Sequence, residues 1–195
     1  MFTAADAQAV LDFWFGAPGS AMHGQWREAW FRKDVEFDAA IAQRFAPIVE
    51  TALTGGLRDW MAAPDRALAR IVLLDQFTRN MFRETPRAFA GDALALEAAL
   101  AMVAAGHDRG LEAIPRSFAY LPFEHAESLA MQDESVRLFS GLADEMPTLR
   151  HMLAYANRHR DVIVRFGRFP HRNAVLGRNS TAEELAFLSQ PGARF

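Results

Sequence analysis

The sequence predicts an all-α protein of seven to eight helices, packed as antiparallel αα-hairpins. Helix caps, prolines and glycines recur along the whole chain of 195 residues at the spacing of helix ends. Alternating runs of Val, Ile and Thr, which are typical of strands, are not seen in the sequence. Apolar residues make up 51% of the chain and charged residues 23%, a balance that favours a folded core over disorder. We expect one domain over residues 1–195.

Each expected helix begins at a Thr or Asp cap or at a proline, which suits the first turn of a helix. The expected helices run over residues 3–15, 34–53, 64–82, 92–106, 122–139 and 147–166, followed by a short one after a capping box at Thr181–Glu184. Pro47 lies inside the second helix, where its missing N–H predicts a kink or a break. Residues 107–121 form the longest irregular connection that we expect, and Gly167–Pro170 form a turn.

The composition excludes several classes of function. The chain has no cysteine, which excludes disulfides, thiolate metal sites, iron–sulfur clusters and a cysteine nucleophile. Its net charge of −3 argues against general nucleic-acid binding. The N-terminal segment carries Asp6 and Asp12 without a basic residue, unlike a secretory signal, and no run of 18 apolar residues is available to span a bilayer. We expect a cytoplasmic protein that does not associate with membranes.

Two ionisable residues fall on the apolar faces of expected helices, and they are the candidate catalytic residues. Helical spacing places Glu124 in the apolar sector of residues 122–139 and His159 in the middle of the apolar sector of residues 147–166. A buried carboxylate must be paired, protonated or facing a polar cleft. A purely structural interpretation stays open for each residue. Glu124 would lie near a helix N-terminus, where the helix dipole favours a carboxylate whatever its function, and His159 would be a hydrogen-bonded histidine of the core.

A polar stripe follows the apolar run Ile71–Leu74. Gln76, Arg79 and Arg83 recur at helical spacing, and Asp75 precedes Arg79 by one turn. One interpretation is an exposed face that carries an ordinary ion pair. The flanking apolar run instead indicates a helix buried on most sides, whose polar stripe lines a cleft.

Positive charge concentrates near the C-terminus. From residue 151 to residue 178 the chain holds six arginines, three histidines and a single acid. Within this stretch, the segment FGRFPHRN contains Arg168, His171, Arg172 and Asn173, whose donors suit a phosphate or a carboxylate. The alternative is a solvated basic face that pairs with the acidic stretch Asp133–Glu145.

Five segments of the sequence stand out as motifs: VLDFWFG (Val10–Gly16), WFRKD (Trp30–Asp34), LLDQFTRNMFR (Leu73–Arg83), FAYLPFEHAES (Phe118–Ser128) and RHRDVIVRFGRFPHRNAVLGRNST (Arg158–Thr181). Together they resemble a bacterial family known as domain of unknown function 924, and they cover most of the chain in order. The resemblance implies a tetratricopeptide-like, right-handed helical array and no particular activity. The characteristic segments of the family fall here on residues that include Asn80, His125, Glu127 and Arg165.

The leading hypothesis is a site for a small anionic ligand that bears phosphate or carboxylate, with acid/base chemistry from Glu124 and His159. The predicted ligand-binding residues are Gln76, Arg79, Asn80, Arg83, His125, Arg165, Arg168, His171, Arg172 and Asn173. The alternative is a non-enzymatic module that binds a peptide or a partner protein in a helical groove.

A metal site built from Glu124, His125, Glu127 and His171 is a third hypothesis. It is disfavoured because HExxH and the ExxH pairs of di-iron bundles are missing from the sequence. No P-loop, dinucleotide fingerprint or nucleophile elbow is seen, so we expect no cofactor and no metal. The sequence leaves open the oligomeric state and whether the protein is an enzyme.

Overall fold

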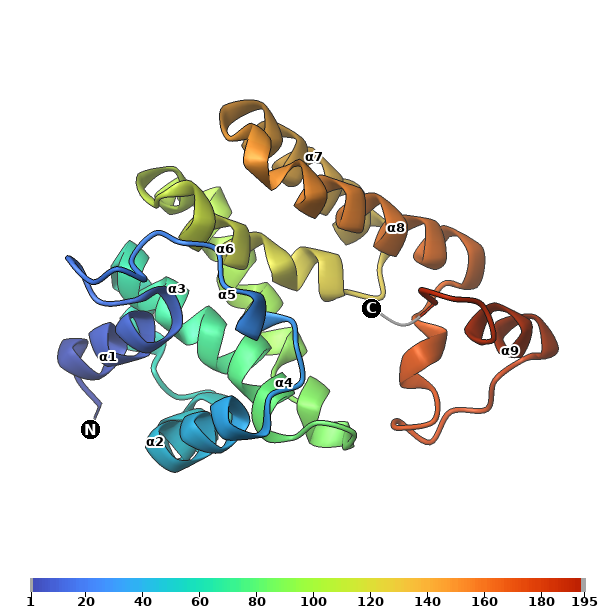
Figure 1. Cartoon of the computed structure of the whole chain (residues 1–195), viewed down its shortest axis with the longest axis horizontal. Coiled ribbons are helices and arrows are strands. Elements are labelled where there is room, and N and C mark those ends of the chain that lie inside the picture. The colour runs from blue at the N-terminus through green and yellow to red at the C-terminus, as the bar shows by residue number, and fades with distance from the viewer. Residues whose placement is uncertain (1, 194–195) are drawn as a thin grey trace. The chain divides into compact units, whose positions relative to one another are not determined.

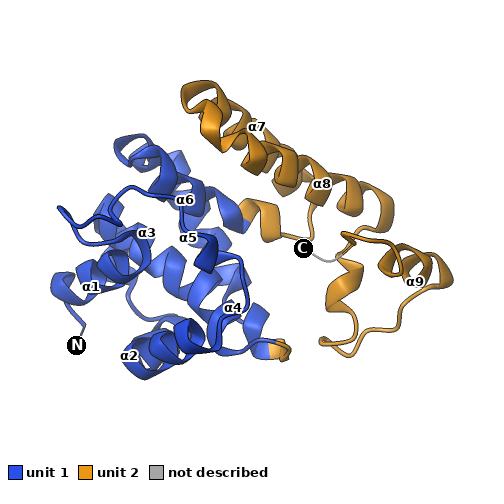
Figure 2. Ribbon diagram, in the orientation of Figure 1, with its two compact units in different colours: residues 1–83, 87–122 blue, residues 84–86, 123–195 orange. Residues whose placement is uncertain are grey.

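A computed structural model describes residues 2–193, which form helices and no strand (Figure 1). The chain divides into two compact units, unit 1 (residues 1–83 and 87–122) and unit 2 (residues 84–86 and 123–195) (Figure 2). The predicted all-α class and number of helices are confirmed, because residues 64–81 form one unbroken helix and bring the described residues to eight helices. The single domain and its tetratricopeptide-like array stay predictions. None of the helices within residues 2–193 combines the length and the apolar content needed to cross a bilayer.

Unit 1 contains the N-terminal helices. They are α1 (Ala4–Phe15), α2 (Val35–Leu53), α3 (Pro64–Ile71), α4 (Thr78–Met81), α5 (Asp92–Ala104) and most of α6 (Ala113–His125). Short 3-10 turns lie along the chain between them: η1 (Glu28–Trp30), η2 (Arg58–Ala62), η4 (Pro86–Phe89) and η5 (His107–Gly110). α3 packs against α1 and α5, and α2 packs against α4. α2 continues through Pro47 without the predicted break.

The core of unit 1 is aromatic, and this unit holds all four tryptophans of the chain. The ring of Trp14 on α1 lies 5.5 Å from the ring of Phe77 and 5.8 Å from the ring of Phe118 on α6. All three side chains are fully buried. Because aromatic side chains bury large apolar areas, these contacts stabilise the packing of helices that are far apart in sequence.

The helix that begins at Pro64 widens between α3 and α4 into a π-helical segment, η3 (Val72–Phe77). A π-turn takes up more residues than an α-turn and displaces the side chains that follow it. Gly91, at the start of α5, packs directly on this segment, since a Cβ at Gly91 would overlap the carbonyl oxygen of Leu74. Only glycine therefore fits where α5 meets the widened turn.

Unit 2 is built on a hairpin of two long helices. It contains the last turn of α6, then α7 (Leu129–Glu145), α8 (Arg150–Phe166) and α9 (Ala182–Leu188), with 3-10 turns η6 (Pro147–Leu149) and η7 (Pro170–Arg172). α7 and α8 lie side by side and antiparallel, joined by a short turn (Figure 1). An ion pair of 2.6 Å between Asp133 Oδ1 and Arg160 Nε links them. The predicted capping box begins α9, because Glu184 N–H donates to Thr181 Oγ1 and Thr181 N–H donates to the Glu184 carboxylate.

The prediction for residues 107–139 is wrong in two respects. Pro122 does not open a helix but lies inside α6, and most of the residues before it are helical rather than irregular. Pro122 costs α6 one backbone hydrogen bond, while Phe118 and Phe123 on either side of it are fully buried. Their burial outweighs that cost, and the chain leaves the helix only at residues 126–128, before α7.

Candidate functional site

A group of polar residues gathers around the rings of Phe169 and His159 in unit 2, and all its members are predicted site residues. They are Glu124 and His125 at the end of α6, His159 on α8, and His171 and Arg172 on η7. We call these residues and Phe169 the Phe169 cluster. Glu124 and His125 belong to it through His159, since the rings of His125 and His159 lie 6.4 Å apart. The ring of Phe169 lies 5.5 Å from that of His159 and 5.6 Å from that of His171, and the guanidinium carbon of Arg172 lies 4.5 Å from its centroid. His125 and His171 are partly exposed, and the other members are buried.

Glu124 and His159 face each other inside the cluster. His159 Nδ1 lies 3.2 Å from Glu124 Oε1 and 2.9 Å from the carbonyl oxygen of Tyr155. A carbonyl oxygen only accepts hydrogen bonds, so Nδ1 carries the proton of the neutral ring. Nε2 is therefore the nitrogen that can take up a further proton.

Burial lowers the pKa of the His159 ring well below its ordinary value, although a hydrogen bond to a backbone carbonyl opposes this shift. Positive charge on His125, His171 and Arg172 lowers the pKa further. The His159 ring is consequently neutral near pH 7.

The end of α6 that carries Glu124 is fixed by Gln132 on α7. The amide of Gln132 is fully buried and donates to the carbonyl oxygens of Glu124 at 2.7 Å, Ala126 at 2.8 Å and Phe123 at 3.4 Å. The last carbonyl groups of a helix have no partner within the helix, and Gln132 supplies one. Thus α7 holds the backbone of Glu124, and α8 holds His159 against its carboxylate.

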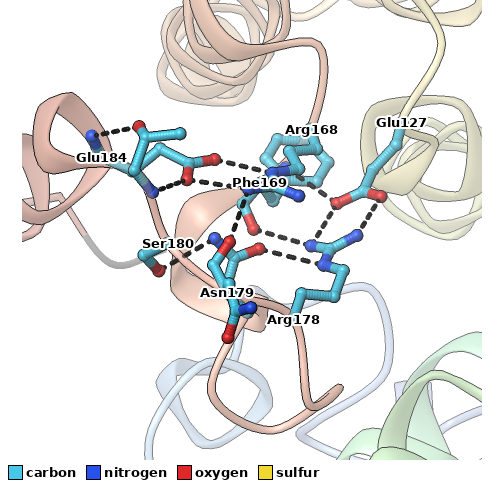
Figure 3. A network of polar contacts seen from close by, with 9 residues as sticks. Glu127, Arg168, Phe169, Arg178, Asn179, Ser180 and Glu184 are labelled. Atoms are coloured by element: carbon cyan, nitrogen blue, oxygen red, sulfur yellow. Dashed lines mark hydrogen bonds and ion pairs between the residues drawn. The ribbon is translucent and has the colours of Figure 1, made fainter.

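Phe169 is held by its backbone as well as by its ring (Figure 3). Its N–H donates to Glu127 Oε1 at 2.8 Å, and its carbonyl oxygen accepts from Arg178 Nη2 at 3.1 Å. Arg178 also makes a forked ion pair with Glu127, with distances of 2.6 Å and 2.9 Å. Arg178 Nε donates at 2.9 Å to buried Asn173, whose amide donates to Ser180 Oγ at 3.0 Å. One guanidinium therefore joins the turn after α6 to the segment after η7.

Two further arginines that we predicted to bind the ligand have carboxylate partners within unit 2. Arg168 makes a forked ion pair with Glu184, at 2.6 Å and 2.8 Å, and these hydrogen bonds hold the pKa of Glu184 at about 2 (Figure 3). Arg165 Nε lies 2.8 Å from Glu183 Oε1. The two arginines line a surface pocket of about 370 Å³, but both glutamates line it too. Positive charge therefore does not dominate this pocket.

In unit 1, Gln76 and Arg79 lie beside a buried aspartate. Arg79 Nη1 is 3.2 Å from Asp75 Oδ1 and 2.9 Å from Asp92 Oδ1, and Gln76 Nε2 donates to Asp75 Oδ2 at 2.6 Å. Asp75 belongs to the π-helical segment and is fully buried. Burial alone would lower the pKa of Arg79, but the two aspartates outweigh burial and raise it. This group is an ion-pair network that joins η3 to α5.

Asn80 and Arg83 share Asp38 on α2. Asn80 Nδ2 donates to Asp38 Oδ1 at 2.7 Å, and Arg83 Nε donates to Asp38 Oδ2 at 2.6 Å. The side chains of the polar stripe in unit 1 thus form hydrogen bonds and ion pairs with acidic residues of the same unit. The convergence of this stripe with the Phe169 cluster on one cleft stays a prediction.

Residues 2–193 contain no group of three or more His, Asp or Glu side chains placed to hold a metal ion. Glu127, one of the four residues of the metal hypothesis, instead forms an ion pair with Arg178.

The residues that sequence analysis missed are the partners of the predicted ones. They include Asp38, Asp92, Gln132, Phe169 and Glu183. Arg178 was part of the basic stretch, but its role as the partner of Glu127 was not predicted. Most of these contacts join residues that are distant in sequence, so no local spacing indicates them. Arg79 and Asp75, one helical turn apart, are the exception.

Two comparisons with known proteins found a match and one did not. A sequence model of the family described as "Bacterial protein of unknown function (DUF924)" matches residues 10–192. A search of curated proteins gave no significant match. Among solved structures, the protein of unknown function ATU0120 from Agrobacterium tumefaciens is similar, with 38% sequence identity and a TM-score of 0.85. This similarity covers 96% of the present chain and 99% of the other, so the two proteins share their fold along nearly their whole length.

Proposed function

Since the chain belongs to the family DUF924, bacterial proteins of unknown function, we propose a function from its own residues. The Phe169 cluster binds a small anionic ligand, bearing phosphate or carboxylate, and transfers a proton to or from it. The observation that carries this proposal is the burial of Glu124, His159 and Arg172 in one cluster. Charged and titratable side chains are seldom buried together unless they are paired or functional, and perturbed pKa values concentrate at functional sites.

Arg172 and the two partly exposed histidines supply the contacts for the anion. The guanidinium of Arg172 offers forked donors that match two oxygens of a phosphate or a carboxylate. Its packing 4.5 Å from the centroid of the Phe169 ring supports a fixed plane for those donors. His125 and His171 are the members of the cluster that solvent reaches, so an incoming ligand meets them first.

His159 and Glu124 act on the proton. The lowered pKa of His159 leaves Nε2 unprotonated near pH 7, and a bound anion raises that pKa because it offsets the neighbouring positive charges. When Nε2 takes a proton from the ligand, the Glu124 carboxylate, 3.2 Å from Nδ1, stabilises the imidazolium that forms. Binding and proton transfer are thereby coupled through one ring.

The proposal does not require the polar stripe of unit 1, in which Arg79 pairs with Asp92 and Arg83 with Asp38. It also does not require Arg165 or Arg168, which pair with glutamates. We further propose a cytoplasmic location, with which the lack of cysteine is consistent.

The test is thermal unfolding in the presence of inorganic phosphate and, separately, of citrate. A site filled at 100 times its dissociation constant adds about 2.7 kcal/mol to the free energy of unfolding. Phosphate also stabilises many proteins by exclusion from their surface, so variants decide the outcome. Arg172→Met is expected to lose the saturable part of the response. Arg160→Met, which removes a surface guanidinium paired with Asp133, is expected to keep it.

Identical responses of the wild type and Arg172→Met to both anions would contradict the proposal. Stabilisation by peptides in a groove, without any anion response, would favour the non-enzymatic alternative.

A further inference from the structure

We infer that Glu127 is a positioning residue of the Phe169 cluster, which fixes the backbone of Phe169 and so sets the places of His171 and Arg172 relative to His159. What the cluster binds rests on the proposed function. The positioning itself rests on the contacts of Glu127 alone.

The carboxylate of Glu127 accepts three hydrogen bonds. One comes from the Phe169 N–H at 2.8 Å, and two come from Arg178 at 2.6 Å and 2.9 Å (Figure 3). Burial alone would raise the pKa of Glu127, but the hydrogen bonds from Arg178 and from Phe169 outweigh burial and lower it. The carboxylate therefore stays charged well below neutral pH, and the forked pair persists.

The fixed backbone of Phe169 also restricts the residues that follow it. Its N–H is bound to Glu127 and its carbonyl oxygen to Arg178, so both backbone groups are fixed. The next residue is Pro170, whose ring fixes its φ angle, and the Arg172 N–H closes the turn on the Phe169 carbonyl oxygen at 3.1 Å. A short closed turn with two fixed ends leaves His171 and Arg172 little freedom of direction.

The pair of Glu183 with Arg165 provides a matched control in the same unit. It too joins a glutamate to an arginine, at 2.8 Å, but both side chains are about half exposed, at 60% and 48%. Within residues 2–193 the carboxylate of Glu183 accepts only from this guanidinium, whereas Glu127 also binds the backbone of Phe169. Exposed pairs of this kind contribute little to stability.

The experiment compares Glu127→Gln with Glu183→Gln by NMR of the imidazole groups, first without ligand and then in a titration with inorganic phosphate. In Glu127→Gln the signals of His159 and His171 are expected to move before phosphate is added. Its dissociation constant for phosphate is expected to rise about tenfold, because small displacements of aligned groups are costly. Glu183→Gln is expected to match the wild type in both respects. Arg178→Lys, which keeps the charge but loses the fork, is expected to resemble Glu127→Gln and replaces it if that variant fails to fold.

Wild-type imidazole signals and wild-type phosphate affinity in Glu127→Gln and Arg178→Lys would overturn the inference. If the wild type does not respond to phosphate, the proposed function fails, and the imidazole signals recorded without phosphate still decide whether Glu127 positions the cluster.

Discussion

His159 Nδ1 lies 3.2 Å from Glu124 Oε1, yet the two residues do not form a conventional ion pair, because burial keeps the ring neutral near pH 7. A neutral ring can accept a proton at Nε2 and leave the carboxylate to stabilise the product. Under the proposed function, this arrangement serves proton exchange with the ligand.

The first prediction is that the protein loses stability as the pH falls below about 6.5, the ordinary pKa of histidine. In the unfolded chain His159 takes up a proton there, whereas the lowered pKa keeps it neutral in the folded protein. Protons therefore favour unfolding, and stability is fully present only above that pH. The slope from this group approaches about 1.4 kcal/mol per pH unit. Urea unfolding between about pH 5 and pH 8 measures it.

His159→Asn should flatten this slope. His151→Asn is the control, since His151 lies on the same helix, also contacts a backbone carbonyl through Nδ1, at 2.9 Å, and is exposed. Equal slopes in the wild type and in His159→Asn would contradict the assignment.

Glu124→Gln separates anion binding from proton transfer. The substitution keeps the size of the side chain and removes an ionisable carboxyl group from the cluster, so phosphate should bind as tightly as to the wild type or more tightly. Arg172→Met should lose phosphate binding. Isothermal titration of both variants with inorganic phosphate measures the difference. A loss of binding in Glu124→Gln that equals the loss in Arg172→Met would show that the carboxylate shapes the site rather than acting on the proton.

Gly91→Ala should destabilise unit 1, because the added Cβ would overlap the carbonyl oxygen of Leu74. Overpacking of this kind costs about 1–3 kcal/mol. Gly141→Ala is the opposite case: this residue lies inside α7, and a Cβ there would meet nothing within 4 Å. It should stabilise the protein by about 0.5–1 kcal/mol, through the better helix propensity of alanine. Chemical denaturation of the two variants gives both values, and a neutral Gly91→Ala would mean that α5 shifts freely.

Arg168→Met should destabilise the protein, because it leaves the carboxylate of Glu184, only 2% exposed, without its forked partner. The pKa of Glu184 should rise from about 2 in the variant, which NMR of the carboxyl carbon detects. Arg165→Met removes a half-exposed partner of Glu183 and should cost less than about 1 kcal/mol. Similar losses in the two variants would argue against a structural role for the Arg168 pair.

Helix ends were predictable where a local cap determines them. Asp34 begins α2 because its carboxylate accepts from the N–H groups of Glu36 and Phe37, at 3.0 Å and 3.1 Å. The course of α6 was not predictable from Pro122, since the local preference of a proline competes with the burial of its neighbours. The π-helical turn was missed because no spacing within residues 72–77 indicates it, and the residue that packs on it, Gly91, lies further along the chain.

In the candidate site, too, one residue was predictable from local spacing and another was not. His159 is buried, as the helical spacing of residues 147–166 predicts. Glu124 is buried too, but the spacing argument used a helix from Pro122 that does not exist. Its burial follows from its place in the last turn of α6, which Gln132 holds.

The tryptophans separate the two units spectroscopically, because all four belong to unit 1. Trp14 and Trp60 are fully buried, so their emission moves to longer wavelength when unit 1 unfolds. Circular dichroism, in contrast, follows the helices of both units. Coincidence of the two signals during denaturation is the behaviour of a single cooperative domain over residues 1–195. A fluorescence transition at a different denaturant concentration would instead assign separate stabilities to the aromatic core and to the hairpin that carries His159.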